Sequence, residues 1–320
     1  MIFDDIDQFV SQHRLVMPGQ TVIVGFSGGP DSLFLLSYLV HIRIRENLTL
    51  IAAHLDHEWR SSSVDDRLFC ERWCADHKVT LVAQRAADIA VPLPRTCSKE
   101  ECGRVLRRAF FQDVKRQYAA NTIALAHHAD DQLETFFIRL IRGASVAGLA
   151  CMRPRSGDYI RPLLDVHKKD ILDYLTNRDI SYAIDPTNES LDFLRNRIRL
   201  LLMPVIARVD ARAPKNIQRV IAHMQETDIF LNTLVLQSLD SVSDIHQQLI
   251  IKDFLALDIF LQKLIVPQWL YRAGIQVTVS AALVDEIIRF LGNKKSTSHQ
   301  FNQWRIIKRY GCAQIEKNVI

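Results

Sequence analysis

The first half of the chain alternates between apolar and amphipathic segments, and this alternation limits the available folds more than any other feature. The apolar segments TVIVGF, LTLIAAHLDH, VTLVAQ and NTIALAHH lie at 21–26, 48–57, 79–84 and 121–128. Helical patterns follow them at about 31–43, 62–78, 98–118 and 130–143. Strands that are apolar almost throughout are typical of a parallel sheet with helices on both faces. The sequence therefore predicts an α/β domain.

The second half of the chain has a different pattern. Helical periodicity continues through residues 215–290, and the last stretch, FNQWRIIKRYGCAQIE, predicts a small hairpin that turns near Gly311. We place the domain boundary near 212–216. The prediction is a Rossmann-like parallel-sheet domain over residues 1–212, followed by a smaller, mostly helical domain over residues 213–320.

The amino terminus, the apolar runs and the cysteines indicate the compartment in which the protein works. The amino terminus, MIFDDIDQFV, lacks the basic start and apolar core of a signal peptide, and no apolar run approaches the ~20 residues that span a membrane. The six cysteines are scattered without CxxC pairs, so we expect reduced, mostly buried thiols. These features favour a cytoplasmic protein without a membrane partner.

The stretch GFSGGPDS stands where the first predicted strand gives way to a helix. It is neither a Walker loop, since no lysine follows the glycines, nor the G-x-G-x-x-G dinucleotide fingerprint. It does match the G-x-S-x-G nucleophile elbow of hydrolases at Gly25–Gly29. An elbow needs an oxyanion donor from an earlier strand's loop, however, and only about twenty residues precede Gly25. We therefore interpret the hydrolase match as accidental.

Phosphate binding accounts for the same stretch better. Gly28 and Gly29 permit positive φ and a close approach of backbone N–H groups to an anion. Pro30 suits the first turn of a helix, whose dipole would assist the neighbouring serine hydroxyls. Asp31 would repel a phosphate unless a Mg²⁺ ion bridged the two. The hypothesis is a nucleotide phosphate site formed by Ser27, Gly28, Gly29, Pro30, Asp31 and Ser32, with Mg²⁺.

Two charged clusters accompany this loop. Asp130, Asp131 and Glu134 fall on the first turns of the predicted helix, where acids are favoured by the helix dipole alone. Because parallel strands end at one edge of a sheet, these carboxylates should lie near the glycine loop, where they could hold Mg²⁺ or bind amines. Between Arg195 and Arg219 there are seven basic residues and one acid, which suits a polyanion such as RNA but also an ordinary solvated helix face.

Several segments together resemble one known family. SGGPDS matches the S-G-G-x-D-S signature of the PP-loop ATP pyrophosphatases. The remaining segments resemble the tRNA(Ile)-lysidine synthetases within that superfamily, and the match extends over roughly the first 210 residues. These segments are HLDHEWRSSS (54–63), EECGRVLRR (100–108), AHHADDQLETFFIRLIRGASVAGLACM (126–152), RPLL (161–164), DPTN (185–188) and FLRNRIR (193–199).

The resemblance implies specific residue roles. It assigns Asp131 and Glu134 to a lysine substrate, and Asp31, Asp131 and Arg195 to catalysis, with Arg195 at the α-phosphate of ATP. ATP would further contact His54 and His127, for which an ordinary structural role at a strand end is the alternative. Magnesium would be held by Asp31 and Asp130. The implied tRNA contacts are Arg104, Arg107, Arg195, Asn196, Arg197 and Arg199.

The implied reaction has two steps. The C2 oxygen of the wobble cytidine of tRNA(Ile) with a CAU anticodon attacks the α-phosphate of ATP, giving an adenylated base and pyrophosphate. The ε-amine of L-lysine then attacks C2 and displaces AMP, with a nearby carboxylate as general base. A flipped, unstacked base suits such chemistry. The sequence leaves a homodimer open.

The chain departs from the family pattern at Trp59, Arg108 and Cys151, and from its length we expect it to be a short form without the further carboxyl-terminal domain of longer relatives. Arg108 replaces a usual tyrosine, which puts a stacking role there in doubt. The alternatives are a tRNA thiolase, which would need a sulfur-carrying cysteine or CxxC near the site, and an ammonia-dependent NAD or GMP synthetase. A non-catalytic ATP-binding module would have no reason to combine Asp31, Asp131 and Arg195.

Overall fold

The computed structural model describes residues 2–57, 63–94, 96–183, 190–275 and 279–317. The chain divides into two compact units, Met1–Gln225 and Glu226–Ile320. The division lies inside the long helix α10 (Ala213–Ser241), later than the boundary expected near 212–216. Each unit is described separately below.

The first unit contains the elements α1 (Ile2–Gln12), β1 (Thr21–Gly25), α2 (Pro30–Ile42), β2 (Thr49–Asp56), α3 (Ser63–Asp76), β3 (Thr80–Arg85), the 3₁₀ turn η1 (Ala86–Asp88), α4 (Lys99–Gln117), β4 (Thr122–Ala124), α5 (Ala129–Ile141), α6 (Val146–Leu149), β5 (Arg155–Ser156), β6 (Tyr159–Ile160), α7 (Lys168–Thr176), α8 (Leu194–Arg197), the π-helical turn η3 (Ile198–Leu202), α9 (Met203–Val209) and the start of α10. The four predicted strand–helix pairs are therefore confirmed, with the fourth strand shortened to three residues.

The strands of this unit form one sheet whose order is β3-β2-β1-β4-β6-β5. All neighbouring pairs are parallel except β5 and β6. The chain runs outward from β1 to β3 and then crosses back to place β4 on the other side of β1. The strand order thus reverses between β1 and β4, which is where ligands bind in open α/β sheets.

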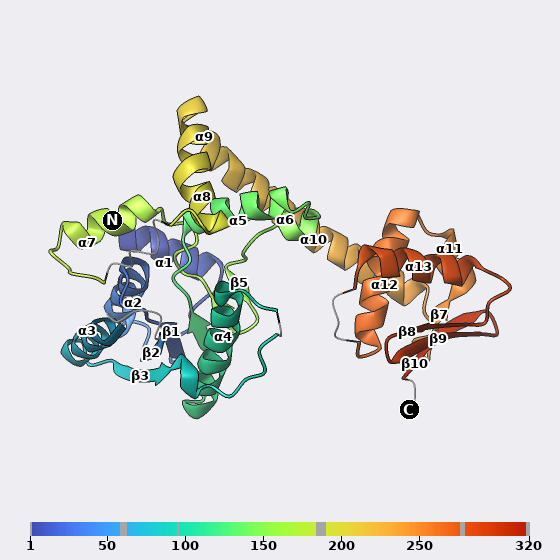
Figure 1. Cartoon of the computed structure of the whole chain (residues 1–320), viewed down its shortest axis with the longest axis horizontal. Helices are drawn as coiled ribbons and strands as arrows, with labels where there is room; N and C mark the ends of the chain where they lie inside the picture. Colours follow the sequence, from blue (N-terminus) through green and yellow to red (C-terminus); the bar gives the residue numbers. More distant parts are fainter. Residues whose placement is uncertain (1, 58–62, 95, 184–189, 276–278, 318–320) are drawn as a thin grey trace. The chain divides into compact units, whose positions relative to one another are not determined.

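Alternation along β1 explains why helices cover both faces (Figure 1). Val22 and Val24 are fully buried in the cluster that contains α1, α2 and α7, whereas Ile23 is buried on the opposite face against Phe110 and Phe111 of α4. Successive side chains of a strand point to opposite faces, so an unbroken apolar strand must be covered twice. The α/β fold predicted from the sequence is confirmed.

The second unit packs the end of α10, α11 (Ile251–Ala256), α12 (Ile259–Arg272) and α13 (Ala281–Gly292) with a small sheet. The sheet has the order β7-β10-β9-β8, with β7 (Leu249–Ile250), β8 (Ser298–Phe301), β9 (Trp304–Arg309) and β10 (Cys312–Lys317). The predicted hairpin is confirmed as β9 and β10, and Gly311 turns it with a φ of +80°. The prediction missed β7 and β8, because strands of two and four residues leave little periodicity to detect.

The prediction of six reduced cysteines is wrong for Cys97 and Cys102, which form a disulfide. Ser98 caps α4 by accepting a hydrogen bond from the Glu101 N–H, and the resulting turn brings the two Cα atoms to 5.7 Å. The other four cysteines are free thiols. None of the helices in the described part of the chain is long and apolar enough to cross a membrane.

Candidate functional site

The glycine loop lies immediately after β1 and is held by its own serines. The Ser27 N–H donates to Ser32 Oγ at 3.1 Å, the two hydroxyl oxygens lie 3.1 Å apart, and Ser32 Oγ donates to the Gly29 carbonyl at 3.0 Å. Ser32 is buried whereas Ser27 is exposed. The loop is therefore ordered from beneath by Ser32 and leaves Ser27 accessible to a ligand.

Gly28 is required by its backbone and by its neighbours. Its φ is +81°, and a Cβ atom there would lie 3.2 Å from Cys70 Sγ and 3.3 Å from Phe69 Cδ1. Pro30 opens α2, where a missing N–H costs nothing, and directs the amino end of that helix toward the loop. Backbone conformation, hydroxyls and helix dipole all suit an anion here.

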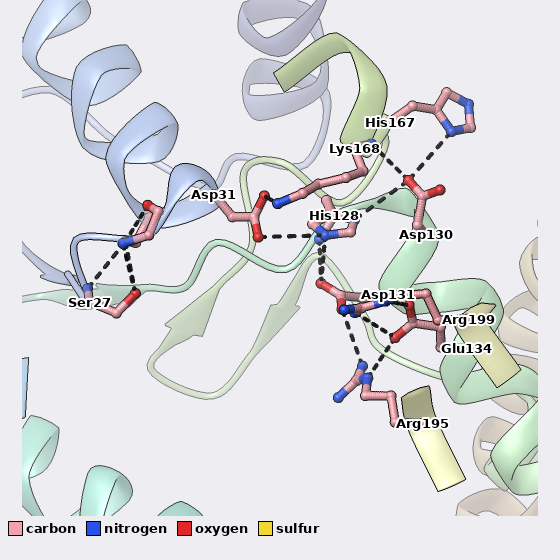
Figure 2. A network of polar contacts seen from close by, with 12 residues as sticks. Ser27, Asp31, His128, Asp130, Asp131, Glu134, His167, Lys168, Arg195 and Arg199 are labelled. Atoms are coloured by element: carbon pink, nitrogen blue, oxygen red, sulfur yellow. Dashed lines mark hydrogen bonds and ion pairs between the residues drawn. The ribbon is translucent and has the colours of Figure 1, made fainter. Parts of the chain in front are cut away.

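His128 lies at the centre of a group of carboxylates at the carboxyl ends of β1 and β4 (Figure 2). It is 4% exposed, and its Nε2 lies 3.8 Å from Asp31 Oδ2 and 3.5 Å from Asp131 Oδ2, while its Nδ1 lies 3.6 Å from Asp130 Oδ2. Burial alone would lower the pKa of His128, but the neighbouring carboxylates of Asp130, Asp131 and Asp31 raise it above its ordinary value. The buried His128 ring thus lies between the three carboxylates of the site.

Asp31 forms an ion pair with Lys168, the first residue of α7 (Figure 2). Lys168 was not singled out in the sequence, because it belongs to neither the loop nor the acidic helix. The segment RPLL at 161–164 marks the region, but no local pattern indicates that its downstream lysine contacts Asp31. Only the packing of α7 against α2 brings them together.

Asp130 caps α7. Its Oδ2 accepts the Lys168 backbone N–H at 2.8 Å and lies 3.8 Å from His167 Nδ1. Burial would raise the pKa of Asp130, but the nearby His128 and His167 rings and the hydrogen bond from the Lys168 N–H hold it well below its usual range. Asp130 and Asp31 lie beside opposite nitrogens of the His128 ring, so they do not converge on one point.

These contacts decide which of the two predicted magnesium ligands, Asp31 and Asp130, suits the ion. No group of three or more His, Cys, Asp or Glu side chains in the described parts of the chain is arranged to hold a metal. A Mg²⁺ ion that arrives with substrate phosphates needs only one or two carboxylates. Asp31, whose side chain is 31% exposed, suits that role, whereas the capping contact of Asp130 favours a structural one.

Glu134 binds two arginines of the basic segment, Arg195 and Arg199. It is 1% exposed, and its Oε2 accepts from Arg195 Nε at 2.7 Å while its Oε1 accepts from Arg199 Nε at 2.6 Å. Arg195 Nη2 also donates to Asp131 Oδ1 at 3.3 Å. The structure therefore joins Asp131, Glu134 and Arg195 as expected for one site, although as mutual partners (Figure 2).

The other residues predicted to contact tRNA lie in different parts of the site. Asn196 is 8% exposed, and its Nδ2 donates to the Ser190 carbonyl at 2.7 Å. Arg197 is exposed. Arg104 and Arg107 lie on exposed positions of α4, and Arg107 is close enough to lower the pKa values of His57 and His127 by its charge. Of these four, Asn196 has the clearest structural role.

The two predicted nucleotide-binding histidines differ. His127 is shielded enough that burial lowers its pKa to about 4, so it is neutral, and its Nδ1 has no hydrogen-bond partner among the described residues. His54 is 5% exposed, and its Nδ1 lies 3.0 Å from the Phe26 carbonyl and 3.5 Å from Cys70 Sγ. His127 remains a candidate for ligand contact, whereas His54 supports the base of the loop.

Two of the segments that suggested the family, and one of the departures from it, lie wholly or partly outside the described residues. The structure does not describe residues 58–62 of HLDHEWRSSS, which include Trp59, or the DPTN segment at 185–188. Among the described segments, FLRNRIR contacts α5 through Arg195 and Arg199, which pair with Glu134.

The chain is similar to known proteins in sequence and in fold. A family model described as a PP-loop domain matches residues 3–206. A tRNA(Ile)-lysidine synthase from Bacillus cereus is 32% identical over 299 residues, which are 90% of this chain and 63% of that protein. A tRNA(Ile)-lysidine synthase from Geobacter sulfurreducens is 36% identical over 241 residues, 74% of this chain and 51% of that protein. The resemblance inferred from the motifs is thereby confirmed.

A solved structure of a U34-tRNA thiolase, NcsA from Methanococcus maripaludis with its [4Fe-4S] cluster, superposes with a TM-score of 0.56 at 19% identity. It covers 66% of this chain and 73% of its own, and at that identity it supports the fold alone. The chain spans only about 63% of the length of the Bacillus cereus relative. Since the PP-loop model accounts for residues 3–206 of the 320, the chain belongs to the PP-loop domain family.

Proposed function

We propose that the protein ligates L-lysine to C2 of the wobble cytidine of tRNA(Ile) with a CAU anticodon, at the expense of ATP. The observation that carries the proposal is the convergence of Asp31 from the glycine loop, Asp131 and Glu134 from α5, and Arg195 from α8 on one sheet edge. The names of the relatives from Bacillus cereus and Geobacter sulfurreducens support the same reaction.

In the first step the C2 oxygen of cytidine bonds to the α-phosphorus of ATP, and the bond to the bridging oxygen breaks to release pyrophosphate. The backbone N–H groups of Gly28 and Gly29, the Ser27 hydroxyl and the amino end of α2 would stabilise the leaving pyrophosphate. Arg195, which is 24% exposed at its side chain, is the cation suited to the α-phosphate. Magnesium bound at Asp31 would add positive charge to the phosphates.

In the second step the ε-amine of lysine bonds to C2, and AMP leaves with the former C2 oxygen. The attacking amine must lose a proton, and a carboxylate within reach can take it. Asp131 and Glu134 share Arg195. Movement of Arg195 to the α-phosphate would release Asp131 Oδ1 for the lysine ammonium group, while Arg199 stays paired with both oxygens of Glu134. The proposed site thus exchanges one cation for another without leaving a buried charge unpaired.

The thiolase alternative is weakened by the free cysteines. Cys70 is the thiol nearest the glycine loop, but it is buried beneath Gly28 and burial raises its pKa far above the usual range, so a nucleophilic thiolate is disfavoured. Cys74 is buried as well, and burial raises its pKa to about 12. Neither is suited to carry sulfur to a bound nucleotide.

The test is incubation of the protein with ATP, Mg²⁺, radiolabelled lysine and a tRNA(Ile) transcript with a CAU anticodon. We expect label on the RNA that depends on ATP and disappears when uridine replaces the wobble cytidine. Asp131→Asn should abolish labelling, whereas Asp210→Asn, at an exposed ion pair, should not. Pyrophosphate release without labelling would instead indicate another member of the PP-loop superfamily. No release of pyrophosphate at all would favour a non-catalytic module.

A further inference from the structure

Lys168 pairs with Asp31, the acid of the glycine loop, and the proposed reaction does not yet use it. Its ammonium group is paired with Asp31, the loop's acid, and the two side chains are 32% and 31% exposed. Both partners of the ion pair are therefore partly accessible to a ligand. In Figure 2 the Lys168 side chain extends from α7 toward Asp31, on the side of His128 that faces Ser27.

The position of Lys168 is fixed by a second contact. The Asp130 carboxylate accepts the Lys168 backbone N–H at 2.8 Å, so the first turn of α7 is tied to the first turn of α5. This hydrogen bond fixes the backbone of Lys168 at the start of α7, and with it the position of the Lys168 Cα atom. Asp130 therefore determines where the Lys168 ammonium group can reach.

The charges explain why a lysine is needed at this place. The negative charge of Asp31 at the amino end of α2 would repel a triphosphate in the loop. The paired ammonium group of Lys168 offsets that charge. When phosphates enter, the same group lies beside them, and an ammonium on a flexible stem can change partner without moving the backbone. Arg195 contacts Asp131 and Glu134 rather than Asp31, and so it is suited to the α-phosphate rather than to the loop.

We propose that Lys168 binds the β- and γ-phosphates of the nucleotide, leaving Asp31 for the cation that accompanies them, and that Asp130 is the residue that positions Lys168. The inference rests on the proposed use of ATP at the glycine loop. It adds a phosphate ligand from α7, an element that the glycine-loop motif does not include.

The first experiment measures displacement of a fluorescent ATP analogue by ATP, AMP and pyrophosphate. Lys168→Met should weaken ATP and pyrophosphate about tenfold or more and leave AMP unchanged, because only the phosphates beyond the α position lose a charged partner. Lys169→Met is the matched control, since it removes the same charge from the neighbouring, exposed position of α7. Unchanged ATP and pyrophosphate affinity in Lys168→Met, or an equal loss for AMP, would overturn the proposal.

A second experiment separates direct contact from mere neutralisation of Asp31. Pyrophosphate affinity is measured without magnesium for Lys168→Met and for Lys168→Met combined with Asp31→Asn. If Lys168 touches phosphate, binding stays weak in the double variant; full recovery of wild-type affinity would mean that Lys168 only cancels the charge of Asp31.

The role of Asp130 is tested by a double-mutant cycle. Asp130→Ala should weaken pyrophosphate binding, Asp130→Asn should largely preserve it because an amide oxygen can still cap α7, and Asp130→Ala should add nothing to Lys168→Met. Additive losses would show that Asp130 does not act through Lys168. If the wild-type protein fails to bind ATP at all, the proposed function fails; if it binds ATP and Lys168→Met binds equally well, only this inference fails.

Discussion

Arg195 Nε donates to Glu134 Oε2 at 2.7 Å, and Arg199 Nε donates to the other oxygen of the same carboxylate at 2.6 Å. Glu134 is 1% exposed, so one buried carboxylate holds two arginines from the following helical segments against α5. A buried charge that loses its partner is strongly destabilising, whereas an exposed one is not. Glu134 is therefore a structural anchor whatever its role toward substrate.

Replacement of Glu134 by Ala should lower the free energy of unfolding by about 3 kcal/mol, because both arginines lose their buried partner. Glu134→Gln keeps the shape and one acceptor oxygen and should cost about 1 kcal/mol. The measurement is urea unfolding followed by circular dichroism. Asp210→Asn is the control, since the Asp210–Arg212 pair is exposed and its loss should leave the midpoint unchanged. A Glu134→Ala midpoint equal to that of the control would contradict the anchoring role.

The acid stability of the first unit should depend on Asp7. Its carboxylate accepts from Arg45 Nη1 at 2.7 Å and from the buried Tyr38 hydroxyl at 2.8 Å. The Arg45 hydrogen bond, against a smaller opposing effect of burial, lowers the pKa of Asp7 below 3.8. A lowered pKa means that the ionised form stabilises the fold. That contribution is complete well above pH 3.8 and is lost as the pH falls through the folded-state pKa.

Asp7→Asn removes the charge and keeps an oxygen for the Tyr38 hydroxyl. At pH 7 the variant should be less stable than the wild type by no more than about 1 kcal/mol, because the pair is partly exposed to solvent. The difference should disappear progressively below about pH 4. Urea midpoints measured between pH 7 and pH 3 test this, and Arg45→Gln should give the same trend. A difference that grows toward low pH would refute the assignment.

The Cys97–Cys102 disulfide predicts the number of reactive thiols in the purified protein. Of the six cysteines only Cys70, Cys74, Cys151 and Cys312 are free. Alkylation of the denatured chain without reductant should add four labels by mass spectrometry, and six after reduction. Because the disulfide closes a short loop, reduction should lower stability by at most about 2 kcal/mol. Six labels without reductant would show that the pair is reduced.

Local sequence patterns predicted the sheet and the glycine loop because both depend on neighbours in the chain. The alternating burial of Val22, Ile23 and Val24 follows directly from an apolar strand covered on two faces. The Asp31–Lys168 pair, in contrast, joins residues 137 positions apart, and no local pattern marks either partner for the other. The same limit hid the structural contact of Asn196, whose place in a basic run suggested RNA. Side-chain partners depend on helix packing, which the pattern of one segment does not encode.

Gly28 in the glycine loop can be compared with Gly19, which lies before β1 and has nearly the same backbone conformation. Gly28 and Gly19 have φ values of +81° and +79°, but a Cβ at Gly28 would meet Cys70 Sγ at 3.2 Å, whereas nothing lies within 4 Å at Gly19. Both Gly→Ala variants should lose about 1 kcal/mol from the left-handed conformation. Only Gly28→Ala also presses against the Cys70 and Phe69 side chains beneath the loop, and it should weaken ATP binding at least about tenfold. Equal ATP affinity in the two variants, measured with the same fluorescent analogue, would mean that the backbone at Gly28 does not approach the phosphates.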